Sequence, residues 1–130
     1  DDFVNYVDFD VNKCLFTSDE DHALERELHL AKLYEGQASI YRSEPFFIEV
    51  MPVGVDKAAS LDILVKKLGM SVEDVIACGD GFNDMSMIKY AGVGVVMANA
   101  QEIVKEAADI VTASNDEDGL VPIIDKYILM

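Results

Sequence analysis

Hydrophobic positions in the second half of the chain follow two alternating patterns. Short continuous apolar runs, typical of strands buried on both faces, occupy residues 75–78, 94–97 and 109–112. Amphipathic segments with apolar positions three and four apart, typical of helices, occupy residues 57–68, 84–90, 101–107 and 120–129. Strands that alternate with helices favour a parallel sheet covered by helices, so we expect an α/β core from residue 52 to residue 130.

A different order of elements is predicted before residue 52. Residues 11–16 have strand character, and Ser18 with Asp21 resembles the capping box of a helix that runs to about Tyr34. Residues 38–42 and 46–51 are two further strand-like runs joined by a short turn, which predicts an antiparallel hairpin. The break Pro52-Val53-Gly54 separates this α+β unit, residues 1–51, from the α/β unit that follows.

Composition narrows the classes of partner. The formal net charge of the 130-residue chain is −15, spread over both halves. Nucleic acids and anionic membranes require Lys/Arg patches, so neither is expected as a partner. No apolar run approaches the ~20 residues of a membrane-spanning helix. Cys14 and Cys78 lie in apolar runs, which predicts buried free thiols and a cytoplasmic location, with a disulfide as the alternative.

The strongest chemical signal is Gly-Asp-Gly-Phe-Asn-Asp at residues 79–84, where a predicted strand ends and a helix begins. Ligands of open α/β sheets bind beyond this carboxyl edge of the strands. Asp80 and Asp84, with Asn83 between them, supply oxygen ligands that suit Mg²⁺. A turn residue at Asp80 and helix caps at the other two positions are the alternatives.

This stretch resembles the metal-binding motif of the haloacid dehalogenase (HAD) superfamily of phosphohydrolases. The resemblance continues upstream in Pro52-Val53-Gly54-Val55-Asp56-Lys57 and downstream in residues 91–100 and 115–119, so it covers essentially the whole chain. These motifs together resemble the Cof-type branch, which carries a large α/β cap. The resemblance implies the C-terminal half of a Rossmann-like parallel-sheet core at residues 52–130. It also implies the remaining part of the substrate-specificity cap at residues 1–51.

One segment of the family pattern is absent. The nucleophile of the family lies in an Asp-x-Asp-Gly-Thr segment after the first strand. Asp8-Phe9-Asp10 matches its first three letters, but Val11-Asn12-Lys13 follows where Gly-Thr should be. Residues 1–7, which precede it, resemble a helix end and a loop rather than an apolar strand, so we interpret Asp8 and Asp10 as cap residues and not as the nucleophile pair. We therefore expect the chain to be the C-terminal part of a longer phosphatase, cut inside the cap and inactive by itself.

The resemblance implies a Mg²⁺-dependent phosphomonoester hydrolase that acts on a sugar phosphate or a similar small metabolite through an aspartyl-phosphate. Asp80 would bind the metal, and Asp84 would be an outer ligand or a brace for the lysine. Lys57 begins a predicted helix, where a lysine is unfavourable against the helix dipole unless it pairs with anions, here the nucleophile and the phosphate. Asn83 would contact the phosphate.

Two further polar residues are candidates for substrate or phosphate contact. Asn99 follows the strand at residues 94–97 and therefore reaches the same sheet edge, where it would steady Lys57 or a phosphate oxygen. Arg42 flanks the predicted hairpin turn and would contact the leaving group. A turn role for Asn99 and a solvated strand position for Arg42 are equally good alternatives.

Two other classes of protein stay open. A catalytically inactive metal-binding or regulatory module would also lack the nucleophile. The phosphorylation domain of P-type ion pumps shares the Gly-Asp-Gly-x-Asn-Asp letters, but these pumps usually continue with Ala-Pro-Ala-Leu, whereas Met85-Ser86-Met87-Ile88 follows here. The pattern does not specify the substrate or the oligomeric state.

Overall fold

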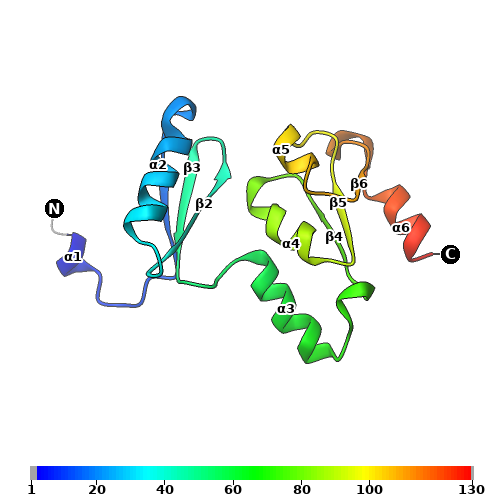
Figure 1. Cartoon of the computed structure of the whole chain (residues 1–130), viewed down its shortest axis with the longest axis horizontal. Helices are drawn as coiled ribbons and strands as arrows, with labels where there is room; N and C mark the ends of the chain where they lie inside the picture. Colours follow the sequence, from blue (N-terminus) through cyan, green and yellow to red (C-terminus); the bar gives the residue numbers. More distant parts are fainter. Residues whose placement is uncertain (1–2, 130) are drawn as a thin grey trace.

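The computed structural model describes residues 3–129, which form two units joined by an extended crossing (Figure 1). Each unit contains one three-stranded sheet, in the order β1-β3-β2 in the first and β4-β5-β6 in the second. The elements of the first unit are α1 (Phe3–Tyr6), β1 (Cys14–Thr17), α2 (Glu20–Leu33), β2 (Ser39–Glu44) and β3 (Phe47–Met51). The elements of the second unit are α3 (Lys57–Leu68), β4 (Ile76–Gly79), α4 (Met85–Tyr90), β5 (Val93–Val96), α5 (Glu102–Lys105), β6 (Ile110–Val111) and α6 (Val121–Tyr127). Three short 3-10 turns lie at Val72–Asp74, Phe82–Asp84 and Asn115–Glu117.

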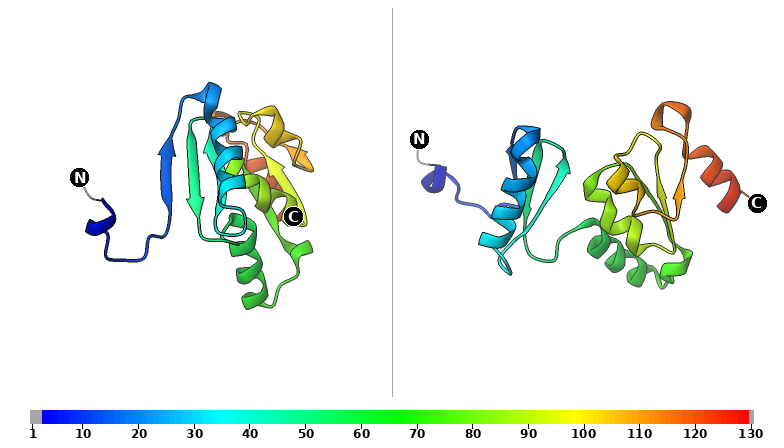
Figure 2. Two further views of the ribbon diagram at one scale, coloured as in Figure 1. Left: turned by 60° about the vertical axis from the view of Figure 1, so that its left-hand side comes forward. Right: turned by 45° about the horizontal axis from the view of Figure 1, so that its top comes forward.

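The first sheet is antiparallel, as the hairpin pattern predicts. β3 lies in the centre, with Leu15 of β1 and Tyr41 of β2 on either side of Glu49. A bulge between Arg42 and Glu44 shifts the register next to the turn. α2 contacts β2 and β3, so one face of the sheet is covered by a helix (Figure 2).

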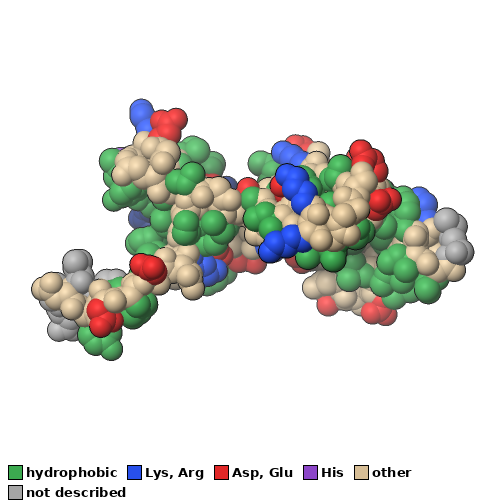
Figure 3. Space-filling model, turned by 90° about the horizontal axis from the view of Figure 1, so that it is seen from below, with side chains coloured by type: hydrophobic (Ala, Val, Ile, Leu, Met, Phe, Trp, Pro, Cys, Tyr) green, Lys and Arg blue, Asp and Glu red, His purple; other side chains and the backbone are tan. Residues whose placement is uncertain are grey.

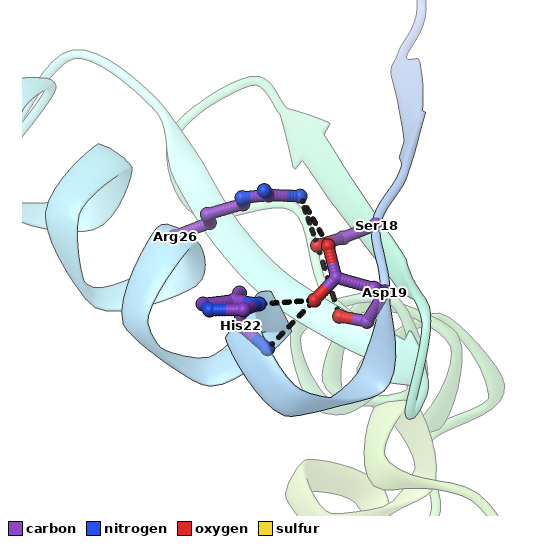
Figure 4. A network of polar contacts seen from close by, with 4 residues as sticks. All are labelled: Ser18, Asp19, His22 and Arg26. Carbon is purple, nitrogen blue, oxygen red and sulfur yellow. Dashed lines mark hydrogen bonds and ion pairs between the residues drawn. The ribbon is translucent and has the colours of Figure 1, made fainter.

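α2 begins one residue later than the predicted capping pair. Its N-cap is Asp19, whose side chain accepts a hydrogen bond from the backbone N–H of His22 at 3.2 Å, so the assignment of Ser18 as the cap is wrong. Asp19 also forms an ion pair with Arg26 at 3.1 Å, and Arg26 donates to Ser18 Oγ at 2.7 Å (Figure 4). A carboxylate at the first turn satisfies the exposed N–H groups and favours the helix dipole, which explains why Asp19 takes the position.

The second sheet is parallel, which confirms the predicted α/β core. Ala77 of β4 lies beside Gly94 of β5, and Val95 of β5 lies beside Ile110 of β6. α4 contacts both β4 and β5 and packs against α3. The close approach of α4 to β5 requires Gly94, because a Cβ at this position would lie 2.4 Å from the carbonyl oxygen of Ile88.

The second unit contains the main hydrophobic cluster, formed by Ile88, Val96, Ala100 and Val104. Three of these side chains are at most 1% exposed, while many apolar side chains on the outer faces of α2, α3 and α6 are at least 40% exposed. The core therefore lies between α4, β5 and α5, directly behind the loop that carries the candidate residues.

On the face seen in Figure 3 the acidic side chains are scattered over both units.

Most predicted elements are found with shifts of one or two residues. α3 has the predicted bounds, whereas the predicted helices at residues 101–107 and 120–129 are shorter in the structure. Both cysteines are free, but Cys14 lies on an edge strand and is exposed, so its predicted burial is wrong. Within residues 3–129 no helix has the length and apolar character required to cross a membrane. The division into two domains at residue 52 stays a prediction, and the two sheets lie on either side of it.

We predict that Ile88→Ala lowers the free energy of unfolding by about 2–5 kcal/mol, because Ile88 is 1% exposed and its truncation leaves a cavity in the cluster. Ile103→Ala on α5 is the matched control, because Ile103 is 54% exposed. The control change should be within about 0.5 kcal/mol. Urea unfolding of the two variants measures the difference, and equal losses would contradict the assigned core.

Candidate functional site

The turn that follows β4 is held by the carboxylate of Asp84. One of its oxygens, Oδ2, accepts hydrogen bonds from the backbone N–H groups of Asp80 and Gly81, both at 3.0 Å. Asp84 precedes α4 but makes no side-chain cap bond to it. A Cβ on Gly79 would lie 2.4 Å from the Cβ of Asp84, so the preceding glycine is required for the carboxylate to fold back over the turn.

The other oxygen of Asp84, Oδ1, accepts a hydrogen bond from Lys57 Nζ. This ion pair links the start of α3 to the turn after β4, and the Asp84 side chain is only 8% exposed. Burial alone would raise the pKa of Asp84, but the Lys57 hydrogen bond and the two backbone N–H groups hold the pKa below its usual value. Of the two roles left open for Asp84, the brace for the lysine matches this geometry.

Asp80 faces the other side of the turn. Asn99 Nδ2 donates to Asp80 Oδ2 at 2.9 Å, and Asn99 Oδ1 accepts from the backbone N–H of Asn115 at 3.0 Å. Three consecutive loops at the carboxyl edge of the parallel sheet are thus connected through one amide side chain. The sequence predicted Lys57 or a phosphate oxygen as the partner of Asn99, whereas the structure places Asn99 against Asp80.

Two of the cavities that residues of the turn line contain the predicted candidates Lys57, Asp80 and Asn99. Lys57 and Asn83 line a cavity of about 480 Å³ between α3 and the exposed face of the first sheet. Asp80 and Asn99 line a smaller cavity of about 270 Å³ beneath the hairpin turn of that sheet. The predicted candidates are therefore brought together at one edge, with the cation and the amide of Asn83 on one side and Asp80 on the other.

Among the described residues, no three His, Cys, Asp or Glu side chains are grouped closely enough to hold a metal ion. Both oxygens of Asp84 already accept hydrogen bonds. Of the two Asp80 oxygens, only Oδ2 accepts a hydrogen bond from a residue in the described part of the chain, residues 3–129. Asp80 therefore fits one position of an oxygen ligand set, and waters or phosphate oxygens would have to complete it. Metal binding at Asp80 and Asp84 stays a prediction.

Arg42 lies outside both of these cavities. Its Nε donates to Glu27 Oε2 of α2 at 2.6 Å, and its guanidinium lies 4.7 Å from the ring centroid of Phe82. Both members of the ion pair are less than 20% exposed. Arg42 thus connects α2, β2 and the turn before α4, and its contact with substrate stays a prediction.

The two aspartates that resemble the start of a nucleophile motif line neither of these two cavities. Asp8 and Asp10 lie in the exposed segment between α1 and β1, beyond the first sheet and away from the second (Figures 1 and 2). Their interpretation as cap residues, and not as a nucleophile pair, agrees with this position.

Comparison with known proteins gives concordant matches. Residues 1–124 match the family model described as haloacid dehalogenase-like hydrolase. Over 93 residues the chain is 48% identical to the 5-amino-6-(5-phospho-D-ribitylamino)uracil phosphatase YcsE of Bacillus subtilis, an alignment that covers 72% of this chain and 37% of that protein.

Solved structures resemble the whole fold. A haloacid dehalogenase-like hydrolase from Bacteroides thetaiotaomicron is 48% identical with a TM-score of 0.73, over 96% of this chain and 47% of that one. The HAD subclass IIB sugar phosphatase BT4131 is 31% identical with a TM-score of 0.82, over 98% of this chain and 47% of that one. The chain therefore spans less than half the length of each of these relatives.

We predict that Asp84→Ala lowers the free energy of unfolding by about 2–4 kcal/mol, because it leaves Lys57 and two loop N–H groups without their acceptor. Lys57→Ala should cost about 1–3 kcal/mol, because it leaves the buried Asp84 carboxylate with only its two backbone N–H donors, although Lys57 itself is 45% exposed. In the double variant the two losses should not add, since both partners are removed together. Lys66→Ala, which breaks an exposed pair with Asp62, is the control and should change the free energy of unfolding only slightly. Additive losses of this free energy in the double variant at positions 57 and 84 would contradict the coupling.

The same ion pair predicts a dependence of stability on pH. The pKa of Asp84 is lower in the folded chain than in the unfolded chain, so its contribution is complete above the ordinary Asp value, about 3.9. The contribution is lost as the pH falls through the folded pKa. Acid titration of the free energy of unfolding should therefore be steeper for the wild type than for Asp84→Asn. Superimposable acid profiles would show that the carboxylate is not stabilised in the folded state.

Proposed function

This chain belongs to the haloacid dehalogenase-like hydrolase family, and we propose that it forms the metal-binding core and cap portion of a Mg²⁺-dependent phosphatase that hydrolyses the monoester of a small metabolite, such as a sugar phosphate. The single observation that carries this proposal is the Lys57–Asp84 pair beside Asp80 at the carboxyl edge of the parallel sheet. The phosphatase names of the relatives support the class of reaction.

In this mechanism Lys57 contacts the phosphate and offsets the charge that develops as the phosphoryl group is transferred. Asp84 keeps the ammonium group in place, because its Oδ1 accepts from Lys57 while its Oδ2 is fixed by the turn. The Asn83 amide lines the same cavity and donates to a phosphate oxygen. These three side chains bind and orient the phosphate.

Asp80 is the residue proposed to hold Mg²⁺, with Asn99 fixing the direction of its carboxylate. The ion would supply Lewis-acid polarisation of a phosphoryl oxygen. The phosphoryl group passes to an aspartate, and water then hydrolyses the aspartyl-phosphate. We do not assign the nucleophile to Asp8 or Asp10, because neither residue lines the cavity that contains Lys57 and Asn83.

We predict that this chain alone releases no phosphate from phosphomonoesters, whereas the product of the complete reading frame that contains it does so with Mg²⁺ and not with EDTA. In that product Asp80→Asn should abolish the Mg²⁺-dependent release. Lys57→Ala should lower kcat/KM by about 10²- to 10³-fold, because a preorganised cation is lost from the site. Colorimetric phosphate detection with a panel of phosphomonoesters measures each effect.

Lys66→Ala, on the same helix but in an exposed pair with Asp62, is the control for Lys57→Ala and should retain activity. Release by this chain alone that disappears on Asp80→Asn would place the nucleophile among residues 1–130 and overturn the interpretation of Asp8 and Asp10. Absence of release from the complete product would favour an inactive metal-binding or regulatory module.

A further inference from the structure

The face of the first sheet that α2 leaves uncovered carries a charged residue, Glu49, at its centre. Side chains alternate along β3, so Ile48 and Glu49 point to opposite faces. Ile48 is 1% exposed and shares a cavity with residues of α2, whereas Glu49 lines the cavity of about 480 Å³ that also contains Lys57. Glu49 therefore points away from α2 and towards the proposed phosphate site.

Glu49 is buried although it is a carboxylate on the central strand of the sheet. The residue is 8% exposed, and its Oε2 accepts a hydrogen bond from Lys13 Nζ at 3.0 Å. Burial alone would raise the pKa of Glu49, but hydrogen bonds from Lys13 and Ser43 and the positive charges of Lys13 and Lys57 hold the pKa below its usual value. Glu49 is therefore ionised, so its side chain can only accept hydrogen bonds.

The ion pair of Glu49 needs a reason beyond stability, because the carboxylate is 11% exposed whereas Lys13 is 49% exposed. A half-exposed pair contributes little to stability and burial of the carboxylate costs desolvation, so packing of the sheet alone does not require Glu49 and Lys13. The opposite face of the same sheet has a partly buried pair, Arg42 with Glu27, which lines neither of the two cavities beside the turn. Glu49 and Lys13 differ from that pair because they face the cavity that contains Lys57 and Asn83.

The chemistry of the cavity wall discriminates between ligands. An ionised carboxylate accepts from hydroxyl groups and repels a second anionic group. Lys13 donates to hydroxyl oxygens and offsets the charge of Glu49 at longer range, so the repulsion of a second anionic group acts only where that group meets the carboxylate directly. Tyr41, directly opposite Glu49 on β2, has a raised pKa because of burial and of the nearby negative charges of Glu49 and Asp56, so it is a neutral phenol that both donates and accepts. Apolar side chains, among them Met51, Leu61 and Met87, line the rest of the cavity, so the wall suits an uncharged ligand that has both hydroxyl groups and apolar faces, as a sugar does.

We infer that Glu49 determines specificity by accepting hydrogen bonds from hydroxyl groups of the substrate's leaving group, with Lys13 as its positioning residue. The enzyme therefore prefers monophosphates of sugars or polyols to esters that lack hydroxyls and to those with a second phosphate at this wall. This inference rests on the proposed function and adds the class of leaving group to it.

The test compares Glu49→Gln with the wild type in the product of the complete reading frame, using three probes. Glucose 6-phosphate carries hydroxyls, phenyl phosphate carries none, and fructose 1,6-bisphosphate carries a second phosphate. Glu49→Gln should lower kcat/KM for glucose 6-phosphate by roughly 10- to 100-fold, because a charged acceptor of substrate hydroxyls is lost. Hydrolysis of phenyl phosphate should change less than about twofold, and the ratio of bisphosphate to monophosphate activity should rise.

Two further variants separate recognition from folding. Ile88→Ala weakens the hydrophobic cluster of the second unit and lines neither cavity, so it should leave the ratio between the three substrates unchanged. The double variant Lys13→Met/Glu49→Leu replaces the facing pair with apolar residues, so it should fold and should lose the preference for glucose 6-phosphate over phenyl phosphate.

The outcomes distinguish this inference from the function on which it rests. Equal losses with all three substrates, or no change in their ratios, would show that Glu49 is only structural and would overturn the inference while phosphatase activity stands. If the wild type hydrolyses none of the three probes or any other phosphomonoester of the panel, the proposed function itself fails and the inference fails with it.

Discussion

The carboxylate of Asp84 is the constraint on which the rest of the site depends. It is almost completely buried, and each of its oxygens has a defined task, one with Lys57 of α3 and one with the backbone of the turn. A buried carboxylate that lost either partner would be costly, so the position of α3 and the shape of the turn are determined together. The glycine at position 79 is part of the same constraint, because no side chain fits beside Asp84 there.

The parallel register of the second sheet explains why the remaining candidates meet. Parallel strands end at one edge, so the segments after β4, β5 and β6 emerge side by side. Asn99 connects all three, because it contacts Asp80 after β4 and Asn115 after β6. A turn that is fixed by Asp84 on one side and by Asn99 on the other leaves Asp80 exposed in one direction, which is the geometry that a metal ligand needs.

Local signals in the sequence predicted the elements well, and contacts between distant residues were less predictable. The bounds of α3 agree with the sequence because Asp56 caps its start and Gly69, with a φ of 66°, ends it. The capping residue of α2 was missed because Ser18 and Asp19 are adjacent and both are good caps. The partner of Asn99 depends on strand order, which a pattern of apolar runs does not specify.

Glu49 was missed altogether, although a charged residue in the otherwise apolar run of β3 was a visible signal. Its meaning depended on Lys13, which is 36 residues away in the sequence, and on the face of β3 that α2 leaves uncovered. The exposure of Cys14 has the same origin, because an edge strand looks like a central one until the sheet is assembled.

The acidity of the whole chain and the neutrality of the candidate cavity are compatible because charges act over short distances. At physiological ionic strength the interaction between exposed charges is screened beyond about 8 Å. The net charge of −15 therefore contributes little inside the cavity, where Lys13 and Lys57 each face a buried carboxylate. In the proposed function, a phosphate that enters would meet Lys57 already positioned by Asp84, and the rest of the ligand would meet Glu49 already positioned by Lys13. Two ion pairs of the same construction, one in each unit, thus give the two ends of the cavity different chemistry.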